Sequence, residues 1–200
     1  MNTTLISKYP EQVSKLFFYF KQLDINTQGN DVKTFKEFLT GIEEFSERIS
    51  DDIDIRKKFK GDMLEIFSEV FFTLFENDPE IGIKNYKPIS IDQDFGCDAE
   101  GINVNGDRVA VQVKFRSNPL DCVTYEELAK TDTSARRLLK IDTSKKDVIY
   151  IFTSAFDLSN AAKTVLDDSL VFMGFNQISY KVDNNKNFWD NAWELIKGHN

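Results

Sequence analysis

The feature that most constrains the fold of this chain is the dipeptide Asn105-Gly106, which separates two runs that contain Ile and Val. Asn-Gly between such runs is the strongest short signal for a β-hairpin, because both residues tolerate the positive φ angles of tight turns. Residues 101–104 and 107–115 are therefore predicted to form two antiparallel strands. A further strand, roughly over residues 84–91, is expected to lie alongside them.

Apolar residues repeat at helical spacing on both sides of this hairpin. The helices that they predict cover residues 11–23, 32–49, 55–76, 125–139, 159–166 and 188–196. Two apolar runs, at residues 147–152 and 170–173, predict further strands. This order of elements predicts an α/β domain in which helices cover both faces of a mixed β-sheet. We expect that domain to span residues 53–200 and to carry a helical N-terminal extension over residues 1–52.

Composition excludes several classes of protein. The chain has 200 residues with two cysteines and one histidine, and Cys97 and Cys122 stand far apart in sequence. These residues cannot supply a structural zinc site, and a disulfide framework is not expected. No apolar run approaches the roughly 18 residues that a membrane span requires. The first residues lack the basic start and apolar stretch of a signal peptide, so we expect a cytoplasmic protein.

The net charge of −8 is concentrated in one segment of the chain. Residues 61–100 hold ten acidic and two basic residues, whereas residues 101–150 hold seven acidic and nine basic ones. A concentration of carboxylates beside a more basic segment suits a cation site that faces a polyanion.

The predicted strand at residues 109–115 carries polar side chains on a face that the sheet should bury. Side chains alternate along a strand, so Gln112 and Lys114 share one face with Ala110, while three valines and Phe115 occupy the other. Burial of an amide or an ammonium group without a partner costs several kcal/mol. The acid-rich segment 92–98 is the expected source of a partner.

Asp98 lies 14 residues before Gln112, which is the length of a hairpin that doubles back. The hairpin is therefore expected to bring the Asp98 carboxylate close to Gln112 and Lys114. Oxygen ligands suit Mg²⁺, so we predict a Mg²⁺ (or Mn²⁺) site formed by Asp98, Gln112 and the Val113 backbone carbonyl. A metal ion there would activate a water molecule for phosphodiester hydrolysis. Lys114 would orient that water and stabilise the negatively charged transition state.

These residues resemble the PD-(D/E)XK nuclease superfamily. Asp98 is followed by Gln112-Val113-Lys114, and a helix that bears Gly61-Asp62-Met63-Leu64-Glu65 precedes them. The glutamine is similar to the Mrr-type branch, which often has Gln where other branches have Glu. The resemblance implies a restriction-endonuclease-like fold, metal binding by Asp98 and Gln112, a catalytic role for Lys114 and a contribution from Glu65.

The resemblance covers roughly residues 56–175, including Ile149–Ser154, which is similar to the family's strand after the catalytic hairpin. Similar domains also occur at the N-termini of larger helicase-like proteins, so association with such a motor is one expectation. Two positions depart from the family pattern. Cys97 stands where the family has a proline, and Gln112 carries one negative charge less than Glu, which is expected to lower the affinity for metal.

Basic residues that follow the predicted site are candidates for contacts with DNA phosphates. Arg116 is the preferred one, because it stands two residues beyond Lys114 on the same strand face. Lys130, Arg136 and Arg137 lie on the predicted helix 125–139. An ordinary solvated helix face is the alternative explanation for each of these three.

Several interpretations of the polar cluster stay open. The first is a metal-dependent deoxyribonuclease that acts on DNA, alone or as a homodimer. The second is a DNA-binding module of the same fold without turnover, and the third is a protein-interaction domain of a larger DNA-processing machine. A purely structural ion pair between Asp98 and Lys114 is a fourth. A calcium loop over residues 92–103 is excluded, because Cys97 and Asn103 stand where its glycine and glutamate would be.

Overall fold

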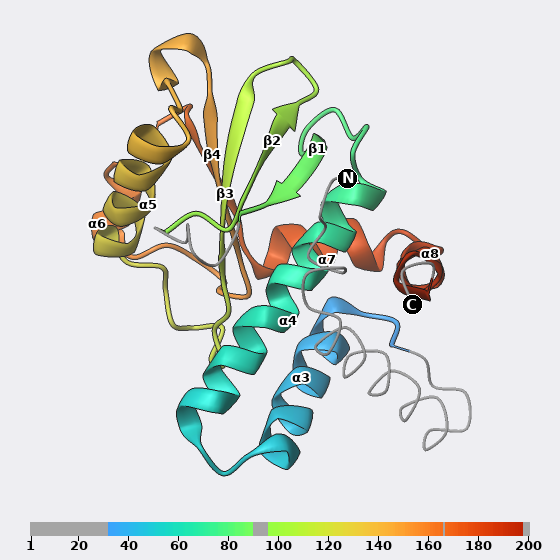
Figure 1. Ribbon diagram of the computed structural model, residues 1–200. Coiled ribbons are helices and arrows are strands. Elements are labelled where there is room, and N and C mark those ends of the chain that lie inside the picture. Colours follow the sequence, from blue (N-terminus) through green and yellow to red (C-terminus); the bar gives the residue numbers. More distant parts are fainter. Residues whose placement is uncertain (1–31, 90–95, 166, 198–200) are drawn as a thin grey trace.

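The structure of the protein is a computed structural model, which describes residues 32–89, 96–165 and 167–197. Its centre is a five-stranded sheet in which the strands follow one another in space as they do in sequence (Figure 1). The strands are β1 (Ile83–Pro88), β2 (Ala99–Asn103), β3 (Arg108–Lys114), β4 (Val148–Thr153) and β5 (Leu170–Met173). The β1–β2 and β2–β3 pairs are antiparallel, and the β3–β4 and β4–β5 pairs are parallel.

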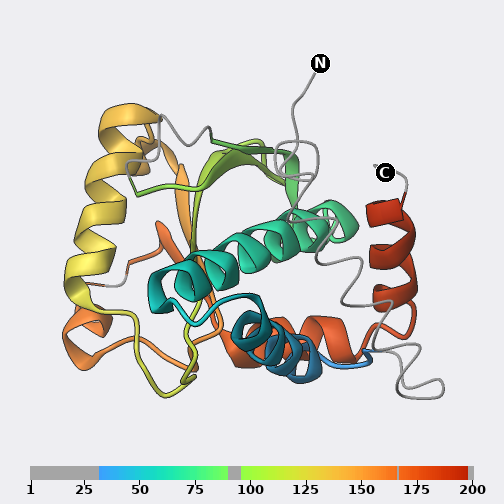
Figure 2. The ribbon, with the colours of Figure 1, turned by 60° about the horizontal axis from the view of Figure 1, so that its bottom comes forward.

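Helices cover both faces of this sheet. They are α3 (Phe35–Ile49), α4 (Ile53–Leu74), α5 (Tyr125–Leu138), α6 (Asn160–Lys163), α7 (Phe175–Asp183) and α8 (Phe188–Lys197). Figures 1 and 2 show α5 and α6 on one face, with α4 and the other helices on the opposite face. The predicted α/β class, with a mixed sheet flanked by helices, is therefore confirmed.

The predicted hairpin is formed by β2 and β3, with Ala99 opposite Val111. Its turn differs from a two-residue Asn-Gly turn, because Gly106 has a φ of 88° while Asn105 is not among the residues with positive φ. The Asn103 side chain organises the turn, and its Oδ1 accepts from the backbone N–H groups of Asn105 and Asp107, each at 2.9 Å. A glycine at the left-handed position after a tight turn is typical of longer hairpin loops.

The two faces of β3 belong to two separate cores, as the alternation predicted. Val109, Val111 and Val113 pack into the larger core with α4, and Ala110 packs into the smaller core beneath α5 and α6. Gln112, on the same face as Ala110, has an exposed fraction of only 3%. The larger core therefore packs the sheet against α4, while the Gln112 amide is buried on the face of β3 that belongs to the smaller core.

Phenylalanine rings fill the larger core. The Phe67 ring of α4 contacts the rings of Phe35 and Phe38 on α3 at centroid distances of 5.1 and 4.6 Å. Aromatic pairs of this kind contribute about 0.5–1.5 kcal/mol beyond the burial of their area. Helix α3 therefore lies in the same core as α4, and the boundary expected after residue 52 falls in the short link between these two helices.

The sequence-based elements agree with the structure to within a few residues, with one omission. Helix α7 was not predicted, although Phe175, Ile178 and Val182 have helical spacing and pack against the larger core. The predicted helix 11–23 lies outside the described residues, as does Leu166, the expected end of the helix that the structure ends at Lys163. Among the helices of the described segments, none combines the length and apolar character needed to span a bilayer.

Candidate active site

Asp98 is held where β2 begins, beside the middle of β3. Its backbone N–H donates to the Val111 carbonyl at 2.8 Å, and its carbonyl accepts from Ile89 N–H at 2.8 Å. The backbone of Asp98 is therefore fixed on both sides. The hairpin brings the Asp98 carboxylate to Gln112, as the sequence predicted.

Three oxygen-bearing groups converge at this point. Asp98 Oδ2 accepts from the Val113 backbone N–H at 2.6 Å and also from the Gln112 amide Nε2. The same amide nitrogen donates to the Val113 carbonyl at 3.2 Å. The Gln112 amide thus lies against the Asp98 carboxylate and the Val113 carbonyl, which are the two other predicted metal ligands.

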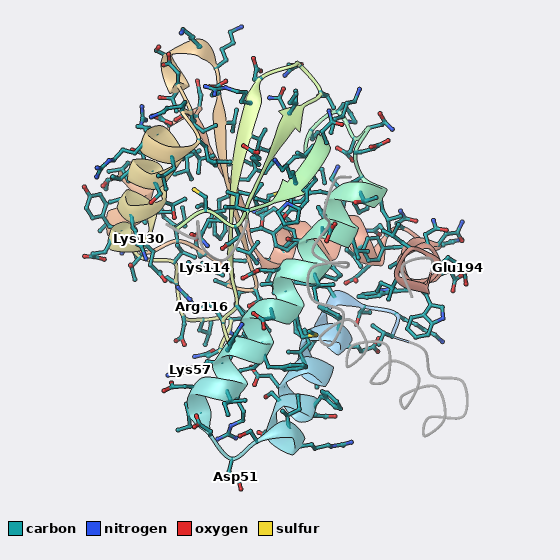
Figure 3. All side chains as sticks on the ribbon, viewed as in Figure 1. Asp51, Lys57, Lys114, Arg116, Lys130 and Glu194 are labelled. Atoms are coloured by element: carbon teal, nitrogen blue, oxygen red, sulfur yellow. The ribbon has the colours of Figure 1, made fainter. Side chains whose placement is uncertain are left out.

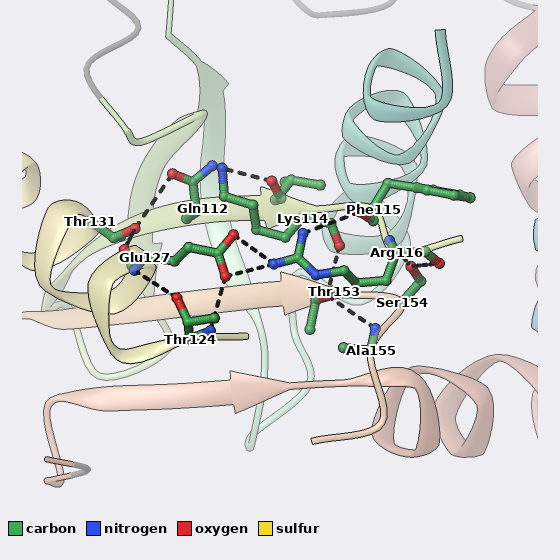
Figure 4. Close-up of polar contacts among 11 residues, drawn as sticks. Gln112, Lys114, Phe115, Arg116, Thr124, Glu127, Thr131, Thr153, Ser154 and Ala155 are labelled. Atoms are coloured by element: carbon green, nitrogen blue, oxygen red, sulfur yellow. Dashed lines mark hydrogen bonds and ion pairs between the residues drawn. The ribbon is translucent and has the colours of Figure 1, made fainter. Parts of the chain in front are cut away.

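The orientation of the Gln112 amide depends on Thr131 of α5. Thr131 Oγ1 lies 3.0 Å from the Glu127 carbonyl and 3.5 Å from Gln112 Oε1 (Figure 4). A hydroxyl has one proton but two lone pairs, so it cannot donate fully to both oxygens. If the amide turned over, Thr131 would donate to Glu127 and accept from Gln112 Nε2. Gln112 Oε1 would then face Asp98 and Val113.

With the Gln112 amide in this second orientation, the oxygen atoms that face one another can be compared with the ligands of a metal ion. This orientation would place a carboxylate, an amide oxygen and a backbone carbonyl around one point, an arrangement that suits a bound cation. Oxygen donors of this kind match Mg²⁺ and Mn²⁺. Among residues 32–89, 96–165 and 167–197, no three His, Cys, Asp or Glu side chains form a metal-binding group. A site here would therefore rely on the amide and the carbonyl as well as on Asp98.

Lys114 completes the same face of β3. Its backbone carbonyl accepts from Thr153 Oγ1 at 2.7 Å, which fixes the end of β3 against β4. The side chain is half-buried and points toward the Gln112 amide (Figure 4). Within the described segments, no carboxylate lies at ion-pair distance from the Lys114 ammonium.

Glu65 of α4 is related to the site by its charge, which acts on Tyr86 of β1. Burial raises the pKa of the Tyr86 hydroxyl well above its ordinary value, and the charges of Asp98, Glu69 and Glu65 raise it further. The hydroxyl forms a hydrogen bond of 2.8 Å with Ser68. Tyr86 therefore stays protonated between the acidic side of α4 and Asp98. The part that Glu65 plays in catalysis stays a prediction.

The predicted DNA-contacting residues differ in where they lie and in how they are held. Arg136 and Arg137 are in the last turn of α5, and the residues just after this turn contact Arg108, at the opposite end of β3 from Lys114. Lys114 and Arg116 lie between α5, which carries Lys130, and α4 (Figure 3). Both Glu127 carboxylate oxygens accept from the Arg116 guanidinium, each at 2.6 Å. Arg136 is paired with Asp132 at 2.8 Å on the exposed side of α5. Lys130 and Arg137 are exposed on the same helix, and DNA contact by all four residues stays a prediction.

Sequence reasoning did not single out Glu127, Thr131 or Tyr86. A signal for Glu127 was present, because Thr124 and Glu127 have the spacing of a capping box and form one at the start of α5. No comparable signal marked Thr131 or Tyr86, since their contacts with the site depend on how α5 and β1 pack.

Gly96 holds the chain close to α5 just before Asp98. Its φ is +101°, and a Cβ at this position would lie 3.3 Å from Ser134 Oγ. Gly96→Ala is expected to lower the free energy of unfolding by about 1–2 kcal/mol, because an L side chain is strained in this region. It should also displace the Asp98 carboxylate, and it should weaken the binding of Mn²⁺ if this carboxylate holds the ion as predicted.

The control for this change is Gly106→Ala, where φ is +88° and no atom lies within 4 Å of the added Cβ. Urea unfolding should show a lower free energy of unfolding for both variants. Only Gly96→Ala should change the Mn²⁺ affinity measured by calorimetry. Equal Mn²⁺ affinities for the two variants would show that Gly96 does not position Asp98.

No family model matches the chain, and no curated protein sequence matches it. Solved structures that are similar to it include two endonucleases. A repair endonuclease from Pyrococcus abyssi has a TM-score of 0.36 at 19% identity, over 54% of this chain and 46% of that one. The MspJI restriction endonuclease in complex with a 27-mer oligonucleotide has a TM-score of 0.47 at 15% identity, over 82% of this chain and 34% of that one. The matched region thus spans less than half the length of either endonuclease.

Proposed function

We propose that the chain is a metal-dependent endonuclease that hydrolyses phosphodiester bonds of DNA. The observation that carries the proposal is the convergence of the Asp98 carboxylate, the Gln112 amide and the Val113 carbonyl on one point beside the Lys114 ammonium. Acid, amide oxygen, carbonyl and lysine together suit a divalent cation and a phosphate. The resemblance of Asp98 and Gln112-Val113-Lys114 to the PD-(D/E)XK pattern supports the same assignment.

In this proposal Asp98, Gln112 and the Val113 carbonyl hold Mg²⁺ or Mn²⁺. A bound ion of this kind lowers the pKa of a coordinated water and neutralises charge on the scissile phosphate. Asp98 is suited to the task because Val113 N–H and its own backbone pairing fix the carboxylate. Lys114 donates hydrogen bonds to the non-bridging phosphate oxygens and so stabilises the transition state.

A non-catalytic DNA-binding module is the second candidate, and one observation favours it. The Gln112 amide nitrogen already satisfies Asp98 and Val113, so the polar groups have partners within the chain. Such a module would bind DNA through Lys114, Arg116 and the basic residues of α5. It would not need a metal ion.

A plasmid assay separates the two candidates. Supercoiled plasmid incubated with the protein and Mg²⁺ or Mn²⁺ is expected to be nicked or linearised, and EDTA should abolish the effect. Binding to a labelled duplex is measured in parallel at several salt concentrations. No cutting with either metal between pH 6 and 9, together with salt-sensitive binding, would favour the binding module. Absence of DNA affinity even at low salt would favour a protein-interaction domain.

The finer assignments belong to the same proposal. They are membership of the Mrr-type branch, a cytoplasmic location in association with DNA, and assembly with a second copy of the chain or with a helicase-like motor. A second copy is proposed because cutting both strands of a duplex commonly takes two sites. The mass of the protein in solution, alone and with DNA, tests that assignment.

A further inference from the structure

Gly61 stands in the middle of α4, where glycine is one of the least favourable residues. Its φ is not positive, so the backbone does not require a glycine there. Apart from the neighbouring residues and the backbone of its own helical turns, no described atom lies within 4 Å of the position of an added Cβ. Packing within the described segments therefore does not require a glycine either. A glycine of this kind lets the backbone of another molecule approach the helix closely.

The side of α4 that contains Gly61 points away from the core. Residues four apart share a face of a helix, so Lys57, Gly61 and Glu65 form one line along α4. All three keep part of their surface exposed, whereas Phe59 and Met63 on the opposite side are at most 7% exposed. The line covers eight residues of helix, or roughly 12 Å. It runs from an exposed lysine to the glutamate predicted for the site.

The segment that follows β3 lies against the same part of α4. The Lys60 ammonium donates to Ser117 Oγ at 2.6 Å and to Glu43 of α3 at 2.8 Å. It also lies 5.6 Å from the centre of the Phe115 ring. The Lys60 side chain is only 13% exposed, so these contacts hold it in one place. Ser117 is therefore fixed next to the turn of α4 that contains Gly61.

The charges on this side of α4 suit a polyanion. The Lys57 ammonium lies 3.8 Å from Asp54, and the two side chains are 70% and 93% exposed. Ion pairs between solvated groups are weak, so Lys57 can exchange this contact for a phosphate. The carboxylate of Asp62, which follows Gly61, is paired with Lys58 at 2.9 Å. Its negative charge is thus already balanced within the helix.

We propose that the side of α4 formed by Lys57, Gly61 and the adjoining Ser117 binds the sugar–phosphate backbone of duplex DNA beside the candidate active site. Lys57 pairs with a phosphate, and the missing side chain of Gly61 lets the strand lie against the helix. Figure 3 shows Lys57, Arg116 and Lys114 one after another beside α4, so this surface continues the site. A line of roughly 12 Å corresponds to the rise of about three to four nucleotides of one strand. The choice of DNA as the occupant rests on the proposed function.

A series of side chains at Gly61 tests the close approach. Gly61→Ala and Gly61→Leu introduce better helix formers, so the melting temperature should rise by about 1–4 °C. Affinity for a labelled duplex, measured at low salt with EDTA so that binding is separated from cutting, should fall about threefold for alanine and about tenfold for leucine. A more stable protein that binds DNA less tightly has not lost its fold. Unchanged affinity in both variants would overturn the proposal.

Lys57→Gln tests the phosphate contact. It should weaken binding to the same duplex about three- to tenfold and reduce the salt dependence of binding by about one unit. The matched control is Lys145→Gln, because Lys145 also pairs with an aspartate three residues earlier, at 3.3 Å, and is 78% exposed. Lys145 precedes β4 and lies at the opposite end of the parallel strands from Lys114. Equal losses in the two variants would indicate diffuse attraction of charge and would contradict a contact at α4.

A further control separates bulk from position. Thr40→Leu enlarges an exposed residue in the middle of α3 and should leave DNA affinity unchanged. If the Gly61 substitutions change the mass of the protein in solution but not its DNA affinity, this side of α4 joins two copies of the chain and the proposal is wrong.

The proposal and the proposed function fail in different ways. If the wild type binds duplex DNA and the Gly61 series weakens binding, but no metal supports cutting, the surface on α4 stands and the nuclease assignment fails. If the wild type cuts plasmid while the Gly61 and Lys57 variants bind as tightly as the wild type, the nuclease assignment stands and the surface is wrong. A wild type without affinity for duplex DNA at low salt would overturn both.

Discussion

Lys114→Ala is expected to reduce DNA cleavage by about 10²- to 10³-fold, the loss that follows removal of one transition-state donor. The half-buried Lys114 side chain is expected to contribute little to the fold, because no ion pair joins it to another residue that the structure describes. The free energy of unfolding should therefore change by about 0.5 kcal/mol or less. Single-turnover cleavage of a labelled duplex at saturating protein measures the rate, and chemical denaturation measures the stability.

The matched control is Lys130→Ala, which removes an exposed lysine from α5 on the same side of the sheet. If Lys130 contacts phosphate, its loss should weaken DNA binding and reduce the salt dependence of binding by about one unit, with little effect on the single-turnover rate. Cleavage by Lys114→Ala at the wild-type rate would show that the chemistry has been assigned to the wrong residue.

Gln112→Glu is expected to make the stability of the protein depend on divalent metal. The Gln112 side chain is 3% exposed, and its amide nitrogen donates to Asp98 and to the Val113 carbonyl. An ionised glutamate has no donor, so two carboxylates and a carbonyl would face one another. An uncompensated buried charge costs about 3–5 kcal/mol, and we expect a loss of that size with EDTA at pH 7.

Millimolar Mg²⁺ or Mn²⁺ should restore most of this loss, because a cation is what three converging oxygens require. Lower pH should also restore part of the stability lost in Gln112→Glu. The two carboxylates share a proton more readily in the folded than in the unfolded state, so the destabilisation is fully present at high pH and fades as the pH falls. Thermal unfolding with EDTA and with metal measures both effects.

Gln177→Glu makes the same substitution at an exposed position of α7 and should show neither effect. A Gln112→Glu protein that stays destabilised in the presence of both metals would argue against a cation site at Asp98. It would favour the DNA-binding module in its place.

The hairpin and its consequences could be predicted from the sequence because they depend on local rules. Asn105-Gly106 reversed the chain, and alternation placed Gln112 and Lys114 on one face of β3. The length of the connection was enough to expect Asp98 close to Gln112 without knowledge of the helices, whereas the exact register, with Ala99 opposite Val111, is set by a loop that differs from the predicted two-residue turn. Helix α7 followed the same kind of rule but was missed, because its nine residues mix three apolar positions with polar ones.

The contacts across the face of β3 could not be predicted in this way. The orientation of the Gln112 amide depends on Thr131, and the position of the Arg116 guanidinium depends on its ion pair with Glu127. Both of these partners lie on α5. Their positions are set by the rotation and height of that helix above the sheet. Sequence spacing contains no information on either quantity. The alternation rule accordingly indicated the face on which Arg116 lies but not the carboxylate that holds it.

The short connection between Asp98 and Gln112 has a thermodynamic consequence. The entropy lost when a loop closes grows with its length. In this protein that entropy is lost during folding, when β2 pairs with β3, and not when a ligand binds. A cation entering between the Asp98 carboxylate and the Val113 carbonyl would thus meet donors that folding has already gathered, with one amide left to rotate. Preorganisation of this kind compensates in part for the weaker attraction of a ligand set that contains only one formal charge.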